Sequence, residues 1–427
     1  MENSVKNLIQ FIDHSPSCFH VIENAKKQFL EHGFIQLEEK EHWNLEEGKS
    51  YFVERNGSSM IAFHLPKKDF QGFHIVASHS DSPTYRIKEQ PEMSVEKHYT
   101  KLNIERYGGM IPETWFDRPL SVAGRIIIEE NGQIKDQLVN VDRDLMIIPN
   151  LAIHMSRSSN ESKQLNPQKD LLPLCGGNLT KDGFEEMIAK ESGVEKEDIL
   201  SYDLFLYNRM RGTTLGINEE FVAAPKLDDL ECAYSSIEGM LNAKLSKDYV
   251  TVCAVFDNEE VGSGTKQGAG STFFPEVLKR ISYLCGKNEE EYYMAVADSF
   301  MLSADNAHAV HPNYQDKTDP TNRPYINEGI VLKYNASQKY TTDANSAALV
   351  KYLCKKEKIK CQVFFNRSDM LGGSTLGNIL TGQVSIKAAD IGLPQLSMHS
   401  TYETAGCKDL DDMITCLLYT SPSPRDM

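Results

Sequence analysis

The N-terminal segment carries apolar side chains at the spacing of a helix. Leu8, Phe11 and Ile12 share one face of a predicted helix, and a Ser-Pro-Ser turn at residues 15–17 separates it from a second helix. Gly33 ends the second helix, because glycine readily takes the left-handed conformation that follows a last helical turn. We therefore predict two helices before the first strand.

Further along, short apolar runs rich in β-branched residues alternate with segments of helical spacing. Several of these runs end abruptly in polar loops, as buried strands do. Alternation of this kind predicts a largely parallel sheet covered by helices on both faces. The predicted strands are residues 73–77, 250–256, 293–297 and 361–365, and the predicted helices are residues 227–241, 274–284 and 343–355.

Between the N-terminal and C-terminal parts of this pattern, the sequence changes to short strand-like segments separated by polar turns. This change predicts a β-rich insertion. Its predicted strands are residues 123–128, 137–141 and 145–148, and a loop-rich stretch covers residues 156–169. The C-terminal residues carry Ser-Pro repeats, and we exclude them from the fold argument. The predicted organisation is an α/β domain formed by residues 1–88 and 222–416, a β-rich insertion at residues 89–221, and an atypical tail at residues 417–427.

The composition excludes some classes of binding partner and indicates a cellular compartment. The chain has 45 basic and 61 acidic residues, a formal charge of −16, so neither nucleic acid nor anionic lipid is an expected partner. No apolar run approaches the ~20 residues that cross a bilayer, and residues 1–11 lack the apolar core of a secretion signal. The nine cysteines are scattered and form no CxxC pair, which predicts reduced thiols in the cytoplasm.

Several polar clusters follow predicted strands, where open α/β sheets bind their ligands. Most of their members are carboxylates and two are histidines, the ligand types that zinc, cobalt or manganese accept in catalytic sites. These clusters predict a metal site. They are His79 with Asp81, residues 257–260, residues 298–305, Asp369 and His399.

Two of these clusters carry specific chemistry. A histidine that binds metal needs an acceptor for its second ring nitrogen, and Asp81 can supply one to His79. The neighbours Glu259 and Glu260 point to opposite sides of the chain, so one can bind metal while the other takes a proton. A solvated loop and an acidic surface turn are the alternative interpretations of these two clusters.

The remaining candidates are weaker when each is taken alone. Asp228 stands at the start of a predicted helix, where a carboxylate also commonly caps backbone donors. Asp305 precedes His308 and His311, and either histidine is compatible with a structural role. A lone histidine such as His399 is more often a satisfied polar residue than a ligand.

Taken in order, ten motifs resemble the aspartyl aminopeptidase family, which includes a related vacuolar leucine-preferring aminopeptidase. The resemblance covers residues 11–413, nearly the whole chain. The motifs are SHSDSP (78–83), YGG (107–109), WFDRPLSVAGR (115–125), IPNLAIHMSR (148–157), NPQKDLLPL (166–174), APKLDDL (224–230), FDNEEVGSG (256–264), SADNAHAVHPNY (303–314), GGSTLG (372–377) and PQLSMHS (394–400).

The resemblance implies a catalytic domain of phosphorylase/hydrolase-like fold, with a mixed, largely parallel sheet flanked by helices and an inserted β-rich dimerisation domain. It also implies dimers assembled into a tetrahedral dodecamer. The chain departs from the family at Lys226, where arginine is usual, at Met110, where a third glycine is usual, and at Gly264, where a bulkier residue is usual. None of these departures removes an expected ligand.

The resemblance also implies two zinc ions per subunit, with cobalt or manganese as alternatives. The residues to which the resemblance assigns a role are metal ligands, acid–base groups and substrate contacts. His79 and Asp305 hold one ion, Glu260 and His399 hold the other, and Asp228 bridges them; Glu259 is the general base with Asp81 behind His79; Lys333, Ser374 and Thr375 form the substrate pocket, and His154 reaches a neighbouring subunit's active site.

The function implied is an aminopeptidase that acts on peptides with a free N-terminus and prefers Asp or Glu, using metal-activated water. An acidic preference needs a locally basic pocket, and Lys333 is the candidate for it unless it is a solvated strand lysine. Three alternatives stay open: a neutral, leucine-type aminopeptidase of the same family, a related two-zinc deacylase or carboxypeptidase, and a non-catalytic scaffold. The scaffold is disfavoured, because it has no need to bury so many carboxylates.

Overall fold

A nine-stranded mixed sheet forms the centre of the fold. The computed structural model describes residues 2–155, 164–179, 182–243 and 245–420. The sheet has the strand order β1-β2-β3-β13-β4-β14-β18-β16-β17, and its middle strands β13, β4, β14 and β18 run parallel. The strands are β1 (Ile35–Leu37), β2 (Lys49–Arg55), β3 (Ser59–Leu65), β4 (Gly72–His79), β13 (Tyr249–Phe256), β14 (Phe300–Ala304), β16 (Ile330–Tyr334), β17 (Cys361–Phe365) and β18 (Lys387–Gly392).

Helices cover both faces of this sheet because its central strands are apolar on both sides. All eight residues of β13 are buried: Val252 and Ala254 pack into one core, and Cys253 and Val255 pack into another on the opposite face. This confirms the predicted α/β class. One face carries α6 (Phe273–Leu284), α7 (Glu289–Ala297) and α9 (Leu376–Gln383), and the other carries α1 (Glu2–Asp13), α2 (Cys18–Glu31), α5 (Leu227–Asn242), α8 (Ala344–Glu357) and α10 (Cys407–Thr420).

The strand predicted at residues 293–297 is wrong, because these residues form the last part of α7. The Asn288 side chain accepts the backbone N–H of Glu291, and the Glu291 side chain accepts the N–H of Asn288, so a capping box starts the helix. Tyr292 and Ala295 face the core at helical spacing. The actual strand, β14, begins at Phe300.

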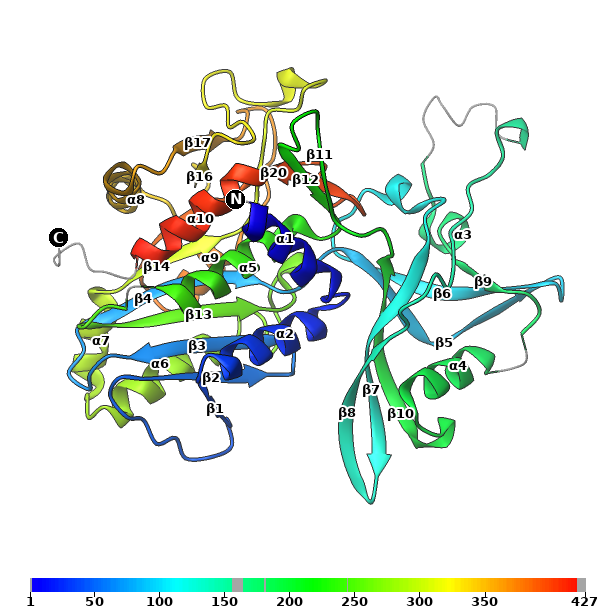
Figure 1. Ribbon diagram of the computed structural model, residues 1–427, viewed down its shortest axis with the longest axis horizontal. Helices are drawn as coiled ribbons and strands as arrows, with labels where there is room; N and C mark the ends of the chain where they lie inside the picture. Colours follow the sequence, from blue (N-terminus) through cyan, green and yellow to red (C-terminus); the bar gives the residue numbers. More distant parts are fainter. Residues whose placement is uncertain (1, 156–163, 180–181, 244, 421–427) are drawn as a thin grey trace.

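A second, antiparallel sheet of six strands lies beside the main sheet and has its own hydrophobic core (Figure 1). Its first strand, β5, begins at Thr84, earlier than the predicted start at residue 89. Of the strands predicted here, residues 145–148 make only isolated bridges. The sheet contains β5 (Thr84–Val95), β6 (Tyr99–Tyr107), β7 (Leu120–Glu130), β8 (Gln133–Asn140), β9 (Leu174–Gly176) and β10 (Ile199–Asn208), and the helices of this region are α3 (Pro167–Asp170) and α4 (Gly183–Ser192).

A small third sheet connects distant segments next to the main sheet. It has the order β11-β12-β20-β19-β15, so residues shortly before α5 pair with residues shortly before α10. Two of its strands, β15 and β19, follow β14 and β18 directly. The strands are β11 (Thr213–Leu215), β12 (Phe221–Ala224), β15 (Ala307–His308), β19 (Pro394–Leu396) and β20 (Glu403–Gly406).

The C-terminal segment belongs partly to the fold. Helix α10 continues to Thr420, and Leu417 is buried in the core against Gly239 of α5. The predicted tail begins at Leu417, so this boundary is too early by at least one core residue; residues 421–427 lie outside the described part of the chain. No helix among the described residues has the length and apolar character needed to cross a membrane.

Truncating Leu417 to alanine is expected to destabilise the protein by about 2–5 kcal/mol, because a buried leucine leaves a cavity when it is shortened. Chemical denaturation of the purified variant measures this loss. Leu371→Ala is the matched control, since Leu371 is 98% exposed and the same truncation there changes stability by less than about 0.5 kcal/mol. Equal effects of the two substitutions would show that Leu417 is not part of the core.

Candidate metal centre

The predicted ligands converge at the carboxyl end of the central parallel strands. His79 is the last residue of β4, Glu260 follows the end of β13 in a 3₁₀ turn (Glu259–Val261), and Asp305 follows β14. Asp228 comes from the start of α5, and His399 comes from the loop after β19. Because β13, β4 and β14 are parallel neighbours, their carboxyl ends meet at one edge of the sheet.

Asp228 lies between two histidines that come from different segments. Its Oδ1 is 3.7 Å from Nε2 of His79, and its Oδ2 is 3.2 Å from Nε2 of His399. Nε2 of His399 is also 3.4 Å from Oε1 of Glu260. Among the described residues, the ligand atoms form three overlapping groups, each within 4.8 Å: Asp228, Glu260 and His399; His79, Asp228, Asp229 and Asp305; and His79, Glu259 and Glu260.

The chemistry of these groups fits divalent cations. Oδ1 of Asp228, Oδ1 of Asp229 and Oε1 of Glu260 are buried and have no hydrogen-bond partner among the residues that the structure describes. A buried carboxylate oxygen without a partner is costly unless a cation or proton meets it. Histidine nitrogen and carboxylate oxygen are also the donor set that catalytic zinc accepts. The residues present therefore fit divalent metal binding at this edge of the sheet.

Burial shifts the acidity of the carboxyl groups around the centre. It raises the pKa of Glu259 to about 8, and the nearby carboxylates of Asp305 and Asp81 act in the same direction. Burial raises the pKa of Asp305 as well, although Lys333 opposes this. Both shifts favour the protonated carboxyl groups, and a bound cation would favour the charged forms instead.

Asp81 contacts the His79 ring and the two loops beside it. Its Oδ1 is 3.3 Å from Nδ1 of His79, and its carboxylate accepts the backbone N–H groups of Glu259 (3.1 Å) and Glu260 (3.2 Å). The hydroxyl of Tyr107 donates to its Oδ2 at 2.7 Å. Asp81 therefore links the loop after β4 to the loop after β13.

The candidate metal ligands open onto a pocket of about 490 Å³ that is also lined by the predicted substrate residues Lys333, Ser374 and Thr375. The amine of Lys333 donates to the carbonyl oxygens of Asp305 (2.6 Å) and Asn306 (3.1 Å), and it lies 3.4 Å from Oδ1 of Asp305. Lys333 is only 2% exposed, so the alternative of a solvated strand lysine is wrong.

The two pocket residues before α9 differ in their contacts. Thr375 is the N-terminal flanking residue of α9, and its hydroxyl donates to Oδ1 of Asp390 at 2.5 Å. The Ser374 hydroxyl contacts the Asn378 side chain at 3.1 Å. Ser374 and Thr375, which directly precede α9, both line the pocket.

Three of the predicted polar residues, His154, His311 and Asp369, lie outside this pocket. His154 is exposed in a 3₁₀ turn (Ile153–Met155) and is not among the described residues that line the pocket. His308 lines the pocket, whereas His311 packs against Tyr314 outside it. Asp369 does not join the centre, because it pairs with Arg367 at 2.6 Å on the surface.

Sequence reasoning missed three groups that surround the ligands: Asp229, Tyr107 and Glu403. Asp229 is fully buried, and its Oδ2 accepts the backbone N–H of His79 at 3.1 Å. Tyr107 belongs to the YGG motif, whose residues carry no predicted role. Glu403 accepts backbone N–H groups of two ligand residues, and its position four residues after His399 is the one signal of this in the sequence.

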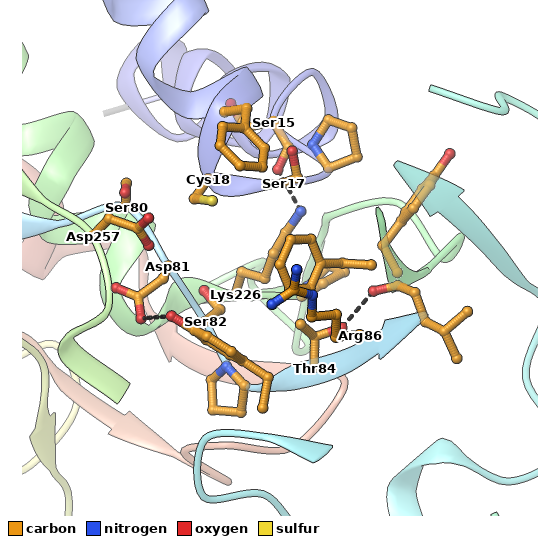
Figure 2. Close-up of a pocket in the computed structure, with 18 of the residues that line it drawn as sticks. Ser15, Ser17, Cys18, Ser80, Asp81, Ser82, Thr84, Arg86, Lys226 and Asp257 are labelled. Atoms are coloured by element: carbon orange, nitrogen blue, oxygen red, sulfur yellow. Dashed lines mark hydrogen bonds between the residues drawn. The ribbon is translucent and has the colours of Figure 1, made fainter. Parts of the chain in front are cut away.

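A second cavity of about 250 Å³ lies behind Asp81, between the first helices and the six-stranded sheet. Figure 2 shows Lys226 in this cavity near Ser15, and the amine of Lys226 donates to the carbonyl oxygen of Ser15. Burial lowers the pKa of Lys226 to about 7. The lysine that departs from the family pattern therefore faces this second cavity rather than the substrate pocket.

A buried group of histidines and carboxylates at the carboxyl edge of an α/β sheet defines a metallohydrolase site. The family profile "Aminopeptidase I zinc metalloprotease (M18)" matches residues 11–420. The chain therefore belongs to the M18 family and is a metallo-aminopeptidase. This confirms the resemblance drawn from the motifs.

Curated relatives and solved structures agree with this family. The chain is 46% identical over 417 residues to the "Probable M18 family aminopeptidase 2" of Clostridium acetobutylicum, with 95% of each chain covered. It is 36% identical to the protein of that name from Pseudomonas aeruginosa, with 96% of each chain covered. Its structure is similar to that in "Cryo-EM structure of the Ape4 and Nbr1 complex", with a TM-score of 0.95, 35% identity and coverage of 98% and 85%. The "Structure of S. cerevesiae mApe1 dodecamer" matches with a TM-score of 0.86, 27% identity and coverage of 98% and 96%.

Proposed function

We propose that this chain is a two-metal aminopeptidase that prefers acidic N-terminal residues. The observation that carries the proposal is Asp228, whose two oxygens face His79 and His399 separately. In this proposal His79 and Asp305 hold one zinc ion, and Glu260 and His399 hold the other. Asp228 would be the ligand shared by both ions, and the same donor set would also accept cobalt or manganese.

Two bound cations would lower the pKa of the attacking water and place positive charge beside the developing oxyanion. Glu259 accepts a proton from that water as the water oxygen bonds to the scissile carbonyl carbon. Glu259 then donates this proton to the leaving amine as the C–N bond breaks. Asp81 holds the backbone of Glu259 and Glu260 in place through two hydrogen bonds. This arrangement supports general-base catalysis by Glu259.

The proposal is tested on the purified full chain by metal analysis and by a panel of substrates. We expect two divalent ions per subunit and hydrolysis of aspartyl and glutamyl anilides that have a free amino group. Faster hydrolysis of leucyl anilide would favour the leucine-type alternative. Hydrolysis of N-acetylated substrates without activity on free amines would favour a deacylase.

We expect Lys333→Ala to lower kcat/KM for aspartyl anilide about 10- to 100-fold more than for leucyl anilide. A buried cation that meets the substrate carboxylate contributes about 1.5–3 kcal/mol through a charged hydrogen bond. The loss of kcat/KM on leucyl anilide measures the separate effect of removing the contact between Lys333 and Asp305. Lys339→Ala is the control, since Lys339 donates to the carbonyl of Gly372 at 3.1 Å and is not among the residues lining the pocket. Equal losses on both substrates would contradict an acidic pocket at Lys333.

We also propose that the β-rich region mediates dimerisation, and that dimers assemble into a tetrahedral dodecamer in the cytoplasm. Exposed apolar residues cluster in sequence around His154, with Leu151, Ile153 and Met155 each at least 48% exposed. One of the structural neighbours, mApe1, is a dodecamer. The mass of the purified protein in solution tests the assembly, and loss of activity in a His154→Ala dodecamer tests the reach of His154 into a neighbouring site.

A further inference from the structure

One buried carboxylate connects two of the metal-ligand segments through their backbones. Glu403, the first residue of β20, is 1% exposed. Its Oε2 accepts the backbone N–H of Asp228 at 2.9 Å, and its Oε1 accepts the N–H of His399 at 2.6 Å. No lysine or arginine of the described chain lies within ion-pair distance of Glu403, so its hydrogen bonds to the backbone are its main contacts.

Both backbone segments that Glu403 contacts are irregular. His399 has a φ of +66°, in the left-handed region that is uncommon for residues other than glycine. Asp228 has φ −83° and ψ 108°, which interrupts the regular geometry at the start of α5. The left-handed backbone of His399 persists only where surrounding contacts hold it. Glu403 supplies such a contact to each segment with one side chain.

The two residues held by Glu403 belong to the same group of ligands. Oδ2 of Asp228 and Nε2 of His399 are 3.2 Å apart, and both join Glu260 in one candidate ion site. The ligands of the other site are held differently. The N–H of His79 donates to Asp229, and the N–H of Asp305 donates to the carbonyl of Ile391 at 3.0 Å.

We propose that Glu403 is a positioning residue that keeps Asp228 and His399 together and thereby sets the affinity of the ion held by Asp228, Glu260 and His399. This inference rests on the proposed two-metal function and adds a selective role for one carboxylate outside the ligand set. The ion held by His79 and Asp305 depends on Glu403 only through the shared Asp228. Partners that orient metal ligands typically contribute about 10- to 100-fold to metal affinity.

The test is zinc titration of the metal-free full chain, wild type against Glu403→Gln. We expect wild type to bind two ions tightly. The variant is expected to bind one ion tightly and the second about 10- to 100-fold more weakly, because the amide keeps the shape but offers only one acceptor oxygen. Excess zinc is expected to restore kcat in the variant with little change in KM, a response that general loss of folding does not give.

Asp409 provides a matched control on α10. It is fully buried and accepts two backbone N–H groups, those of Asn327 (2.6 Å) and Gly329 (2.7 Å). Asp409→Asn therefore removes the same kind of contact outside the ligand groups. We expect it to lower Tm while leaving both zinc affinities unchanged.

Two results would overturn the inference: unchanged affinity for both ions in Glu403→Gln, or equal weakening of zinc binding in Asp409→Asn. If Glu403→Gln is insoluble, Glu403→Asp serves instead, since the shorter acid keeps the charge but cannot reach both N–H groups. The same weakening of one ion is then expected, and unchanged binding again contradicts the inference. A wild-type chain that binds fewer than two ions would instead contradict the proposed function.

Discussion

Replacing Glu259 with glutamine is expected to lower kcat by about 10²- to 10⁴-fold while the protein keeps both metal ions. Glutamine has nearly the shape of glutamate but cannot take a proton from water, and positioned general bases contribute about this much to rate. Steady-state kinetics on aspartyl anilide, with metal analysis of the same sample, measures both quantities. A kcat near the wild-type value would rule out Glu259 as the base.

The neighbouring carboxylate is the control for this experiment. Glu260→Gln makes the same chemical change one residue further on, but Glu260 lies 3.4 Å from His399 within a ligand group. We therefore expect Glu260→Gln to lose zinc affinity and to recover part of its activity in excess zinc, whereas Glu259→Gln recovers none. An identical response of the two variants would show that the roles of these glutamates are not separate.

Much of the central fold could be predicted because its strands are buried on both faces. Continuous apolar runs identify β4 and β13, and the residues that end them are the ones that meet at the site. The error at residues 293–297 has a local cause. The apolar run of α7 is as short as a strand, and only the capping box of Asn288 and Glu291 distinguishes it.

The site residues divide in a similar way. Side chains that carry chemistry have a recognisable type and position in a motif, so His79 and Asp228 could be proposed from the sequence. Glu403 accepts a backbone N–H from a segment far away in the sequence. Tyr107, in the six-stranded sheet, donates to a side chain that follows a strand of the main sheet. Residue type alone gives no signal for such a role, because it depends on which distant backbone groups the fold brings within reach.

Removing the metal ions with a chelator is expected to abolish activity and to destabilise the protein more at pH 8 than at pH 5.5. The pKa of Glu259 is raised to about 8 and that of Asp257 to about 7, in both cases first by burial. A raised carboxyl pKa means that the folded metal-free chain holds protons which the unfolded chain releases near pH ~4–4.5. Its stability therefore falls as pH rises from about 4.5 to 8, by about 1.4 kcal/mol per pH unit for each proton held.

Bound cations beside Glu259 favour its charged form, so the metal-loaded protein should show a flatter dependence of Tm on pH over this window. Thermal unfolding at pH 5.5 and pH 8, with zinc or with chelator, gives the four values needed. Glu259→Gln removes one of the titrating groups, and we expect it to reduce the pH-dependent loss in chelator while leaving the loaded protein nearly unchanged. If chelation lowered Tm equally at both pH values, Glu259 would not be a group whose charge the bound ions stabilise.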